Sequence, residues 1–197
     1  MRAVPIALFA AAVLVACAKD NNENGAPADT AAVTPAPATD TAAPAAAAPT
    51  DPQIAHIAVK ANDIDIDHGK DAKGKATNAE VKAFAQKMIT DHSAVNKQAS
   101  DLATKLSLTP EDNPTSQQLQ SQADQVKSEL SGKSGADYDK AYIASEVTFH
   151  QQVLDALDKV LIPNAQNAEL KALLEKVRPA VDGHLKMAQQ IQAKLGQ

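Results

Sequence analysis

From Asp51 to the end of the chain, apolar residues recur every three or four positions, which is the spacing of helices with one buried face. The stretch near the C-terminus shows this most clearly, with apolar residues at Leu170, Leu174, Val177, Val181, Ala188, Ile191 and Leu195. No stretch alternates between apolar and polar residues as a half-buried strand would. The pattern therefore predicts helices over about residues 51–73, 77–106, 115–131, 136–162 and 166–195.

Residues that favour helix ends lie at these boundaries. Thr77 and Glu80 have the spacing of a capping box, in which two side chains satisfy free backbone amides of the first turn. Thr115 and Gln118 repeat that spacing at the start of the shortest helix. Pro163 is expected to end the fourth helix, because proline lacks the amide that would continue the backbone hydrogen bonding.

Four long helices and one short helix are typical of a four-helix bundle in which the short helix crosses back along the bundle. The roughly 145 residues from Asp51 onward are enough to bury one hydrophobic core. We therefore predict a single all-α domain over residues 51–197.

Several short motifs follow one another along this part of the chain. They are Gly69-Lys70, VKAFAQKMITDHS at residues 81–93, YDKAYI at residues 138–143, His150, and RPAVDGHL at residues 178–185. In these motifs the chain resembles the domain of unknown function 4142 family, bacterial exported proteins that are placed among the ferritin-like helical bundles. The resemblance covers about residues 52–194 and implies a ferritin-like four-helix bundle with a short additional crossover helix. Because the family has no established activity, the resemblance implies no reaction.

Residues 1–17 have the pattern of an export signal. Arg2 precedes an apolar run that is too short to span a membrane as a helix. The stretch LVAC at residues 14–17 resembles the lipobox of bacterial lipoproteins, in which cleavage precedes the cysteine and the cysteine carries the lipid. Cys17 is the only cysteine, so it has no disulfide partner within the chain. We predict a signal peptide over residues 1–16 and lipidation of Cys17; the alternative is an ordinary signal peptide that happens to precede a cysteine.

Residues 18–50 are rich in alanine, proline and threonine and contain no aromatic residue. Such a segment cannot bury enough apolar area to offset the entropy lost on ordering, so residues 17–50 are predicted to be a lipidated, disordered tether. Lipoproteins retained in the inner membrane tend to have aspartate after the cysteine, whereas Ala18 and Lys19 follow here. The sequence thus predicts a domain that faces the periplasm and is anchored to the outer membrane through its lipid.

Charge and composition exclude several functions. The full chain has a formal net charge of −5, and removal of Arg2 with the signal peptide would make it −6. An acidic chain without a basic block is not expected to bind nucleic acid. The sequence has no phosphate-binding glycine loop, GxSxG motif or HExxH motif. Its aromatic content of 3%, without tryptophan, argues against a sugar-binding cleft.

Three of the five histidines lie on the apolar faces of separate predicted helices: His92, His150 and His184. A single histidine in such a position is commonly a neutral core residue with one hydrogen bond. Three that face one core favour a site for a transition metal ion, because imidazole nitrogens are common metal ligands. His68 and Asp65, on the helix predicted over residues 51–73, are further candidate ligands.

The expected heights of these residues along the bundle favour two sites over one. Counted from the starts of their helices, His92 and His150 lie at one level. At a rise of about 1.5 Å per residue, His184 is expected roughly 10 Å higher, beside Asp65 or His68. The sequence therefore predicts a lower pair of histidines and an upper site at His184.

The acidic residues near these histidines argue against a redox enzyme. Di-metal oxidases of this fold have a glutamate three residues before histidine, where this chain has Ile89 and Val181. Glu146 is four residues before His150 and is expected on a solvated flank, within reach of that histidine. Asp91 points about 100° away from the neighbouring histidine and is expected to orient another group or to face solvent. Glu146 and Asp91 are therefore candidates for a supporting role behind the metal ligands.

The sequence favours a non-enzymatic function. The first hypothesis is a binding or envelope-stress module that holds a small ligand or a transition metal ion through its three core histidines. The second is a structural or protein-interaction bundle in which these histidines only form internal hydrogen bonds. A di-metal oxidase ranks last. The sequence specifies neither the metal nor a protein partner.

Overall fold

The computed structural model describes residues 48–196, and all regular elements of this segment are helical. The elements are α1 (Asp51–Lys75), α2 (Ala79–Lys105), α3 (Pro114–Ser131), α4 (Gly135–Ala156), a π-helical turn (Leu157–Leu161), α5 (Ile162–Asn164) and α6 (Ala168–Leu195). The described part of the chain therefore confirms the all-α prediction. The predicted signal peptide, Cys17 and residues 18–47 of the predicted tether lie outside the described residues.

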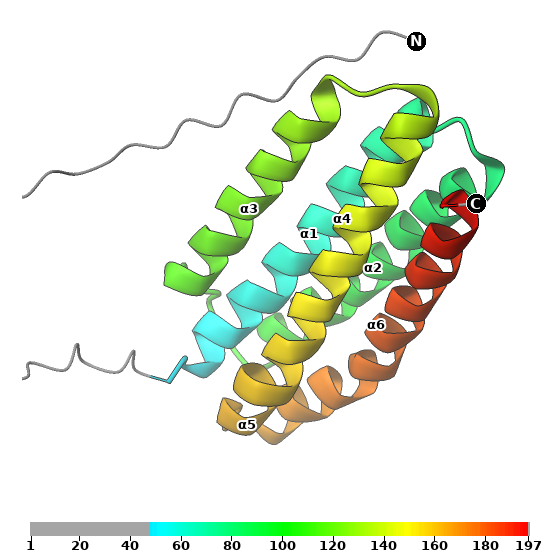
Figure 1. Cartoon of the computed structure of the whole chain (residues 1–197). Helices are drawn as coiled ribbons and strands as arrows, with labels where there is room; N and C mark the ends of the chain where they lie inside the picture. The colour runs from blue at the N-terminus through cyan, green and yellow to red at the C-terminus, as the bar shows by residue number, and fades with distance from the viewer. Residues whose placement is uncertain (1–47, 197) are drawn as a thin grey trace, which may run out of the picture. The chain divides into compact units, whose positions relative to one another are not determined.

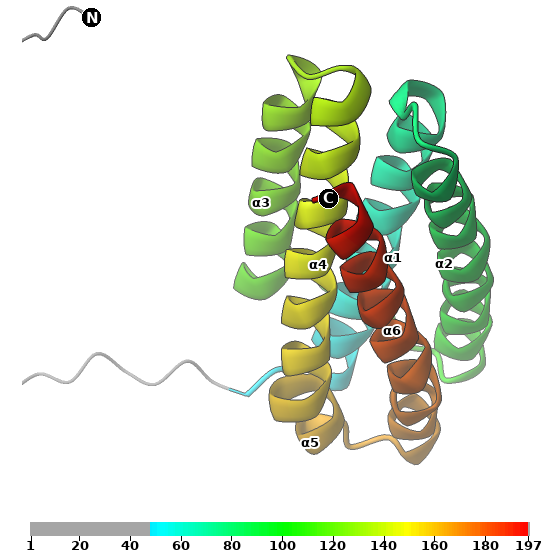
Figure 2. The same ribbon diagram turned by 45° about the vertical axis from the view of Figure 1, so that its right-hand side comes forward.

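The helices α1 and α2 form one antiparallel hairpin, and α4 and α6 form a second (Figure 1, Figure 2). Helix α3 packs on α1 and α4 and returns the chain from one end of the bundle to the other, as predicted for the crossover helix. At Gly69 of α1 the two helices pack so closely that an added Cβ would lie 3.0 Å from the Ala85 carbonyl oxygen of α2. Among residues 48–196, no helix combines the length and the apolar character needed to cross a membrane.

Buried apolar side chains form two clusters at different levels of the bundle. The first includes Phe84, Met88, Tyr142, Ile143 and Ala188. The second includes Ile57, Leu154, Leu157, Leu174 and Val181. Along each long helix, a buried polar residue lies at or near the boundary between the positions that belong to the two clusters. These residues are Asp65 on α1, His92 on α2, His150 on α4 and His184 on α6, so a polar layer interrupts the core.

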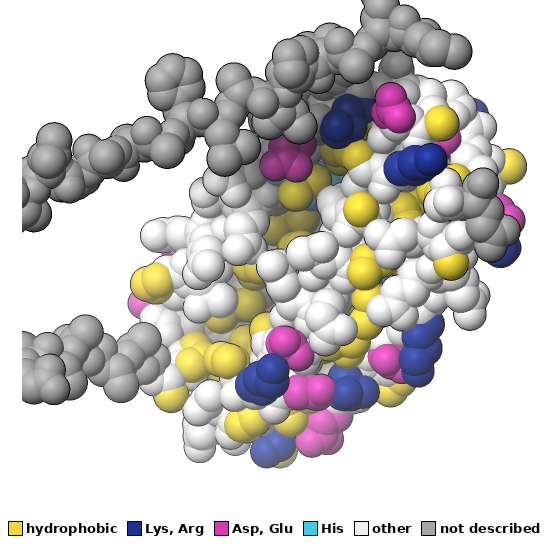
Figure 3. All heavy atoms as spheres, in the orientation of Figure 1, with side chains coloured by type: hydrophobic (Ala, Val, Ile, Leu, Met, Phe, Trp, Pro, Cys, Tyr) yellow, Lys and Arg dark blue, Asp and Glu magenta, His cyan; other side chains and the backbone are white. Residues whose placement is uncertain are grey.

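Most charged residues lie on the outside of the helices. Arg178 of α6 donates two hydrogen bonds to Asp158 of the π-helical turn, at 2.6 and 2.7 Å. On the face drawn in Figure 3, charged side chains gather over the lower end of α4, and apolar side chains show between the helices. Almost no histidine surface is visible on that face. On this face most charged groups are thus at the surface, whereas the residues of the polar layer are buried.

Helices α2 and α3 both begin with asparagine caps. Asn78 Oδ1 accepts hydrogen bonds from two amides in the first turn of α2, and Asn113 Oδ1 does the same for α3. The capping boxes predicted at Thr77 and Thr115 are therefore wrong. Asparagine caps a helix as well as threonine does, and Pro114 favours the first helical position directly after Asn113.

Thr77 instead takes part in a contact between the start of α2 and the start of α4. Its amide and hydroxyl donate hydrogen bonds to the Asp139 carboxylate at 3.0 and 2.6 Å. The Asn78 amide donates to the same carboxylate at 2.8 Å. Because Asp139 is only 1% exposed, this carboxylate joins the two helices inside the protein.

Asp139→Ala should lower the free energy of unfolding by about 2 kcal/mol, because it removes charge-assisted hydrogen bonds and leaves part-buried donors without an acceptor. Urea denaturation followed by circular dichroism measures the change. Asp101→Ala is the matched control, since Asp101 is exposed and pairs with Lys97 at the surface, and it should cost less than about 0.5 kcal/mol. Equal stabilities of the two variants would show that the Asp139 contact does not hold the helices together.

The helical segment that follows α4 passes through proline instead of ending before it. The π-helical turn Leu157–Leu161 leads into α5, which contains Pro163 near its start and ends at Asn164. Proline is tolerated in the first turn of a helix, where its missing amide removes no essential hydrogen bond. The predicted end at residue 162 is therefore two residues early.

Candidate metal centre

His92 of α2, His150 of α4 and His184 of α6 meet in the polar layer. The ring centroids are 5.2 Å apart for His92 and His184, 5.5 Å for His150 and His184, and 5.8 Å for His92 and His150. One nitrogen of each ring lies within 4.8 Å of one nitrogen of each other ring. All three residues are buried, with exposures of 5%, 1% and 3% in chain order. The predicted separation of His184 from the other two is therefore wrong.

The direction of helical side chains explains why the residue count failed. The Cα–Cβ bonds of a helix point toward its N-terminus. Helices α4 and α6 run in opposite directions (Figure 2). Side chains that lean toward the N-terminus of each helix therefore bring the His150 and His184 rings toward each other, with centroids 5.5 Å apart. The inclination of α6 against α4, and the π-helical turn between them, further change the heights at which the residues of these two helices lie along the bundle. A count at constant rise omits these effects.

Two of the rings have outer nitrogens whose partners fix the position of the proton. His150 Nδ1 donates to the Glu146 backbone carbonyl at 2.9 Å, and a carbonyl can only accept. His184 Nε2 donates to Asp91 Oδ2 at 2.8 Å. Partial burial would raise the pKa of Asp91, but hydrogen bonds from Lys87 and His184 outweigh it and lower this pKa. Asp91 is thus an ionised acceptor that orients His184, one of the two roles expected for it.

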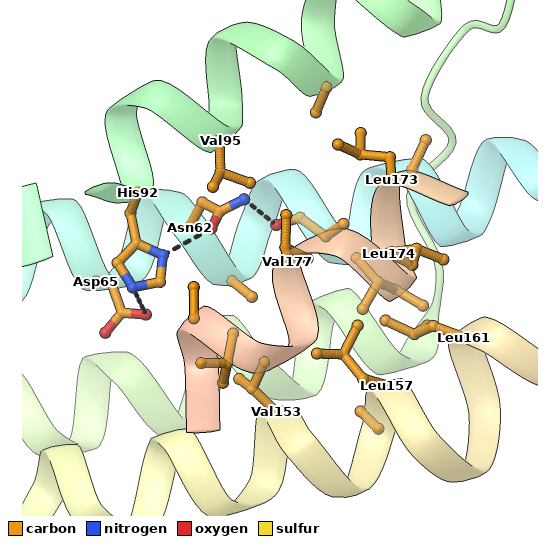
Figure 4. Close-up of a pocket in the computed structure, with 18 of the residues that line it drawn as sticks. Asn62, Asp65, His92, Val95, Val153, Leu157, Leu161, Leu173, Leu174 and Val177 are labelled. Carbon is orange, nitrogen blue, oxygen red and sulfur yellow. Dashed lines mark hydrogen bonds and ion pairs between the residues drawn. The ribbon is translucent and has the colours of Figure 1, made fainter. Parts of the chain in front are cut away.

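The third ring is held by Asn62 of α1. His92 Nδ1 lies 2.7 Å from Asn62 Oδ1 (Figure 4). The Asn62 side-chain amide donates to the Ala58 carbonyl at 3.0 Å, which leaves its oxygen as the acceptor toward His92. His92 therefore carries its proton on Nδ1 and has a lone pair on Nε2. Asn62 was not among the sequence candidates, although it lies three residues before Asp65 and so on the same helix face.

The inner nitrogens are His92 Nε2, His150 Nε2 and His184 Nδ1. They are buried and have no hydrogen-bond partner among residues 48–196. Burial is the largest cause that lowers the pKa of all three imidazoles, and it lowers the pKa of His92 to about 4. The rings are therefore neutral near pH 7, and each keeps a free lone pair. Buried acceptors without a donor are costly, so this arrangement favours a cation or a proton donor among them.

Two carboxyl groups lie beside the histidines. Asp65 Oδ2 is 3.3 Å from His92 Nε2, and Asp65, Glu146 and His150 form a second group with potential ligand atoms within 4.8 Å of one another. Both carboxyl residues are 1% exposed, so the predicted solvated position of Glu146 is wrong. The four-residue spacing does bring Glu146 to its histidine, since Glu146 Oε2 lies 3.5 Å from His150 Nδ1.

These two carboxyl groups differ in their protonation. Burial, and then the neighbouring Asp65, raise the pKa of Glu146 well above its usual value, so Glu146 is protonated near neutral pH. Burial also raises the pKa of Asp65, but His150 opposes that effect. Asp65 is therefore the more acidic member of the pair. Tyr142 is fully buried beside them, and burial raises the pKa of its hydroxyl well above the usual value, so that it stays neutral.

Residues 36–191 match a family described as a domain of unknown function, DUF4142. This match covers more than half of the chain. The chain belongs to the DUF4142 family. The resemblance expected from the sequence motifs is thus confirmed. No curated protein and no solved structure matches the chain significantly.

In this DUF4142 domain, the motifs that carried the resemblance supply most of the site. VKAFAQKMITDHS contains Asp91 and His92, YDKAYI contains Tyr142, and RPAVDGHL contains His184. His68, in contrast, belongs to neither group of potential ligands found among residues 48–196, so the expected pairing of His184 with His68 does not form. The site is therefore one cluster at a single level of the bundle.

Proposed function

We propose that this DUF4142 domain binds one transition metal ion through His92 Nε2, His150 Nε2 and His184 Nδ1. The supporting observation is that the other nitrogen of each ring has its own acceptor, so a free lone pair of each ring remains inside the cluster. Metal-binding histidines commonly donate their second N–H to a carboxylate or a carbonyl in this way, which fixes the tautomer and the ring orientation.

Asp65 is the proposed fourth ligand. Its Oδ2 lies 3.3 Å from His92 Nε2, and both atoms are acceptors that a cation between them would satisfy. A zinc ion about 2.0–2.1 Å from each donor would hold tetrahedral ligand atoms about 3.3 Å apart. Because each histidine offers a nitrogen within 4.8 Å of the other two, movements of about 1.5 Å would bring these three nitrogens to the spacing of zinc ligands.

Three imidazoles and one carboxylate make a nitrogen-rich site. Imidazole suits Zn²⁺, Cu²⁺, Fe²⁺ and Ni²⁺, whereas Mg²⁺ and Ca²⁺ prefer oxygen ligands. Imidazoles that are neutral near pH 7 need not lose a proton before they bind a metal. Zn²⁺ and Cu²⁺ are therefore the first ions to test.

We propose binding, and not catalysis, as the role of this site. Di-metal oxidases in helical bundles combine four glutamates with two histidines, whereas the two groups of potential ligands among residues 48–196 contain three histidines and two carboxyl residues. Coordination by four side chains leaves no open position for a substrate. The alternative is a structural bundle whose histidines form only internal hydrogen bonds. That alternative leaves the three inner nitrogens without a role and gives no affinity for metal.

Asn62→Ala should lower the affinity for Zn²⁺ by about 10–100-fold, because His92 loses the acceptor that fixes its tautomer. Competition with a chromophoric chelator measures the dissociation constant. Asn96→Ala is the matched control, since Asn96 donates to Asp63 at the surface, and it should leave the affinity unchanged. A wild-type protein without affinity for Zn²⁺, or Asn62→Ala with wild-type affinity, would contradict the proposed site.

We also propose that a lipid on Cys17 holds this domain at the periplasmic face of the outer membrane. The support is the apolar run that ends in LVAC at residues 14–17, followed by Ala18 and Lys19. In this position the domain would act as a tethered binding or envelope-stress module.

Cys17→Ser should abolish lipidation, so that the protein either keeps its signal peptide or leaves the membrane fraction. Fractionation of cell envelopes, with mass spectrometry of the N-terminus, checks this outcome. Ser93→Ala, within the bundle and remote in sequence from the signal, serves as the control and should fractionate as wild type does. If Cys17→Ser remained in the outer membrane like the wild type, the lipoprotein assignment would be wrong.

A further inference from the structure

The three histidines of the proposed metal site differ in how near their hydrogen-bond partners lie to solvent. His150 Nδ1 donates to a backbone carbonyl of its own helix, and His92 Nδ1 donates to Asn62, which is only 8% exposed. His184 Nε2 donates to Asp91, whose side chain is 32% exposed. The cluster is therefore connected to solvent through the Asp91–His184 pair.

This pair lies where helices from the two hairpins meet. Asp91 belongs to α2 and His184 to α6, and the two helices lie side by side (Figure 1, Figure 2). Both residues line the same cavity as Asp65 and His92, which are proposed ligands of the metal. Most of the remaining lining is aliphatic and would exclude a hydrated ion. The gap between α2 and α6 at Asp91 is therefore a polar approach to the ligand atoms.

The Asp91 carboxylate is suited to capture a cation at this point. Its Oδ2 accepts hydrogen bonds from His184 Nε2 and Lys87 Nζ, at 2.8 and 2.7 Å. Both bonds end on Oδ2, which leaves Oδ1 for a further partner. The side chain of Lys87 is 43% exposed, so its ammonium group can move into solvent when a cation takes its place. An exposed carboxylate raises the local concentration of divalent cations by Coulomb attraction.

The backbone of α6 is weakened on the N-terminal side of His184. Pro179 lies inside the helix and has no amide, so the Glu175 carbonyl lacks the hydrogen bond that it would otherwise accept. Gly183 directly precedes His184, and glycine is a weak helix former. A Cβ added at Gly183 would meet no atom within 4 Å, so no neighbouring side chain holds this turn from outside. The turn that carries His184 can therefore move at a lower cost than an ordinary helical turn.

We propose that the metal ion enters between α2 and α6, where Asp91 binds it first and His184 is the ligand that moves to admit it. This entry route rests on the proposed metal site. The ion exchanges water for the Asp91 carboxylate, in competition with Lys87. It then passes to His92 and His150 while the turn of α6 that carries His184 is open, and the return of His184 completes the site. No proton is transferred, because the hydrogen bond from His184 Nε2 to Asp91 breaks on opening and forms again on closing.

Stopped-flow mixing of the metal-free protein with Cu²⁺ tests the entry route. Quenching of tyrosine fluorescence reports binding, since both tyrosines lie in the core of the bundle. Asp91→Asn should slow association about tenfold, because the variant keeps an oxygen acceptor for His184 but loses the charge that attracts the ion. Lys87→Gln should speed association about threefold, because it removes the competing ammonium group. Both differences should shrink at about 1 M salt, which screens charges at the surface.

The Lys97–Asp101 pair of the same helix provides the matched control. It has the same four-residue spacing and an N–O distance of 2.9 Å, and both side chains are exposed. Lys97→Gln and Asp101→Asn should therefore leave the association rate unchanged. If Asp91→Asn associated with Cu²⁺ as fast as these controls and only released it faster, Asp91 would merely orient His184, and the entry route would be wrong.

Gly183→Ala tests the movement of His184 while leaving its hydrogen bond in place. Alanine fits the open space and strengthens the helix, so the turn should open less often. Association and dissociation should slow together by about twofold to fivefold, at an unchanged dissociation constant. Gly74→Ala, at an equally open position of α1, should leave both rates unchanged.

The outcomes separate the entry route from the metal site on which it rests. Wild-type rates in Gly183→Ala, in a protein that binds Cu²⁺, would overturn the proposed movement of His184 and leave the metal site standing. A wild-type protein that binds no Cu²⁺ would overturn the entry route together with the metal site.

Discussion

Saturating Zn²⁺ or Cu²⁺ should raise the melting temperature of the wild-type protein by about 8–16 °C. An ion that binds only the folded state stabilises it by about 4 kcal/mol when its concentration is roughly 1,000 times the dissociation constant. For a domain of this size, each kcal/mol raises the melting temperature by about 2–4 °C. Thermal melts followed by circular dichroism, with and without metal at pH 7.5, measure the shift.

His150→Leu should remove this metal-dependent rise. In the absence of metal, the variant should be at least as stable as the wild type. The reason is that leucine takes the place of a buried imidazole whose Nε2 has no hydrogen-bond partner among the described residues. The hydrogen-bond partner of His150 Nδ1 is a backbone carbonyl of its own helix, so the substitution leaves no other side chain without its partner. His56 belongs to neither group of potential ligands, so the His56→Gln variant should keep the full metal-dependent rise in melting temperature. A wild-type protein that responds to none of Zn²⁺, Cu²⁺ and Fe²⁺ would contradict the metal-binding function.

The metal-free protein should lose stability between pH 7 and pH 5, with His92 alone contributing a loss of about 2 kcal/mol. Burial lowers the pKa of His92 to about 4, from about 6.5 in the unfolded chain, and it also lowers those of His150 and His184. Below about pH 6.5, the unfolded chain therefore binds protons that the folded chain does not bind. Acidification in this range consequently favours unfolding.

The two buried carboxyl groups oppose this trend. Because burial raises the pKa values of Asp65 and Glu146, the folded protein holds protons on them that the unfolded chain has lost. We expect the three imidazoles to have the larger effect, so that stability falls on acidification. Urea denaturation at pH 5, 6 and 7 in the presence of EDTA measures the free energy of unfolding. Glu146→Gln should make its fall between pH 7 and pH 5 steeper, because this substitution removes one of the opposing carboxyl groups. Stability that stays constant or rises on acidification would show that the imidazoles are not buried in neutral form.

The fold could be predicted from local sequence features, because helix formation depends on spacing and on a few end signals. The apolar positions of α6 identify its buried face, and Gly69 lies where two helices need close approach. Helix ends were less predictable, since Asn78 and Thr77 are both acceptable caps. The choice between them depends on Asp139, which lies far away in the sequence.

The candidate site was predicted in its residues but not in its arrangement. Apolar neighbours identify His92, His150 and His184 as core residues. Their common level depends on the direction of side chains on antiparallel helices and on the π-helical turn, neither of which a residue count contains. Asn62 was missed because an asparagine on a helix face gives no signal until its partner across the bundle is known.

Anomalous X-ray diffraction from crystals of the Zn²⁺-loaded protein tests the central claim most directly. We expect one strong zinc peak inside the bundle, about 2.0–2.1 Å from His92 Nε2, His150 Nε2 and His184 Nδ1, with an Asp65 oxygen as the fourth ligand. Zinc found only at surface residues, or a cluster in which the three inner nitrogens bind water and no metal, would contradict it.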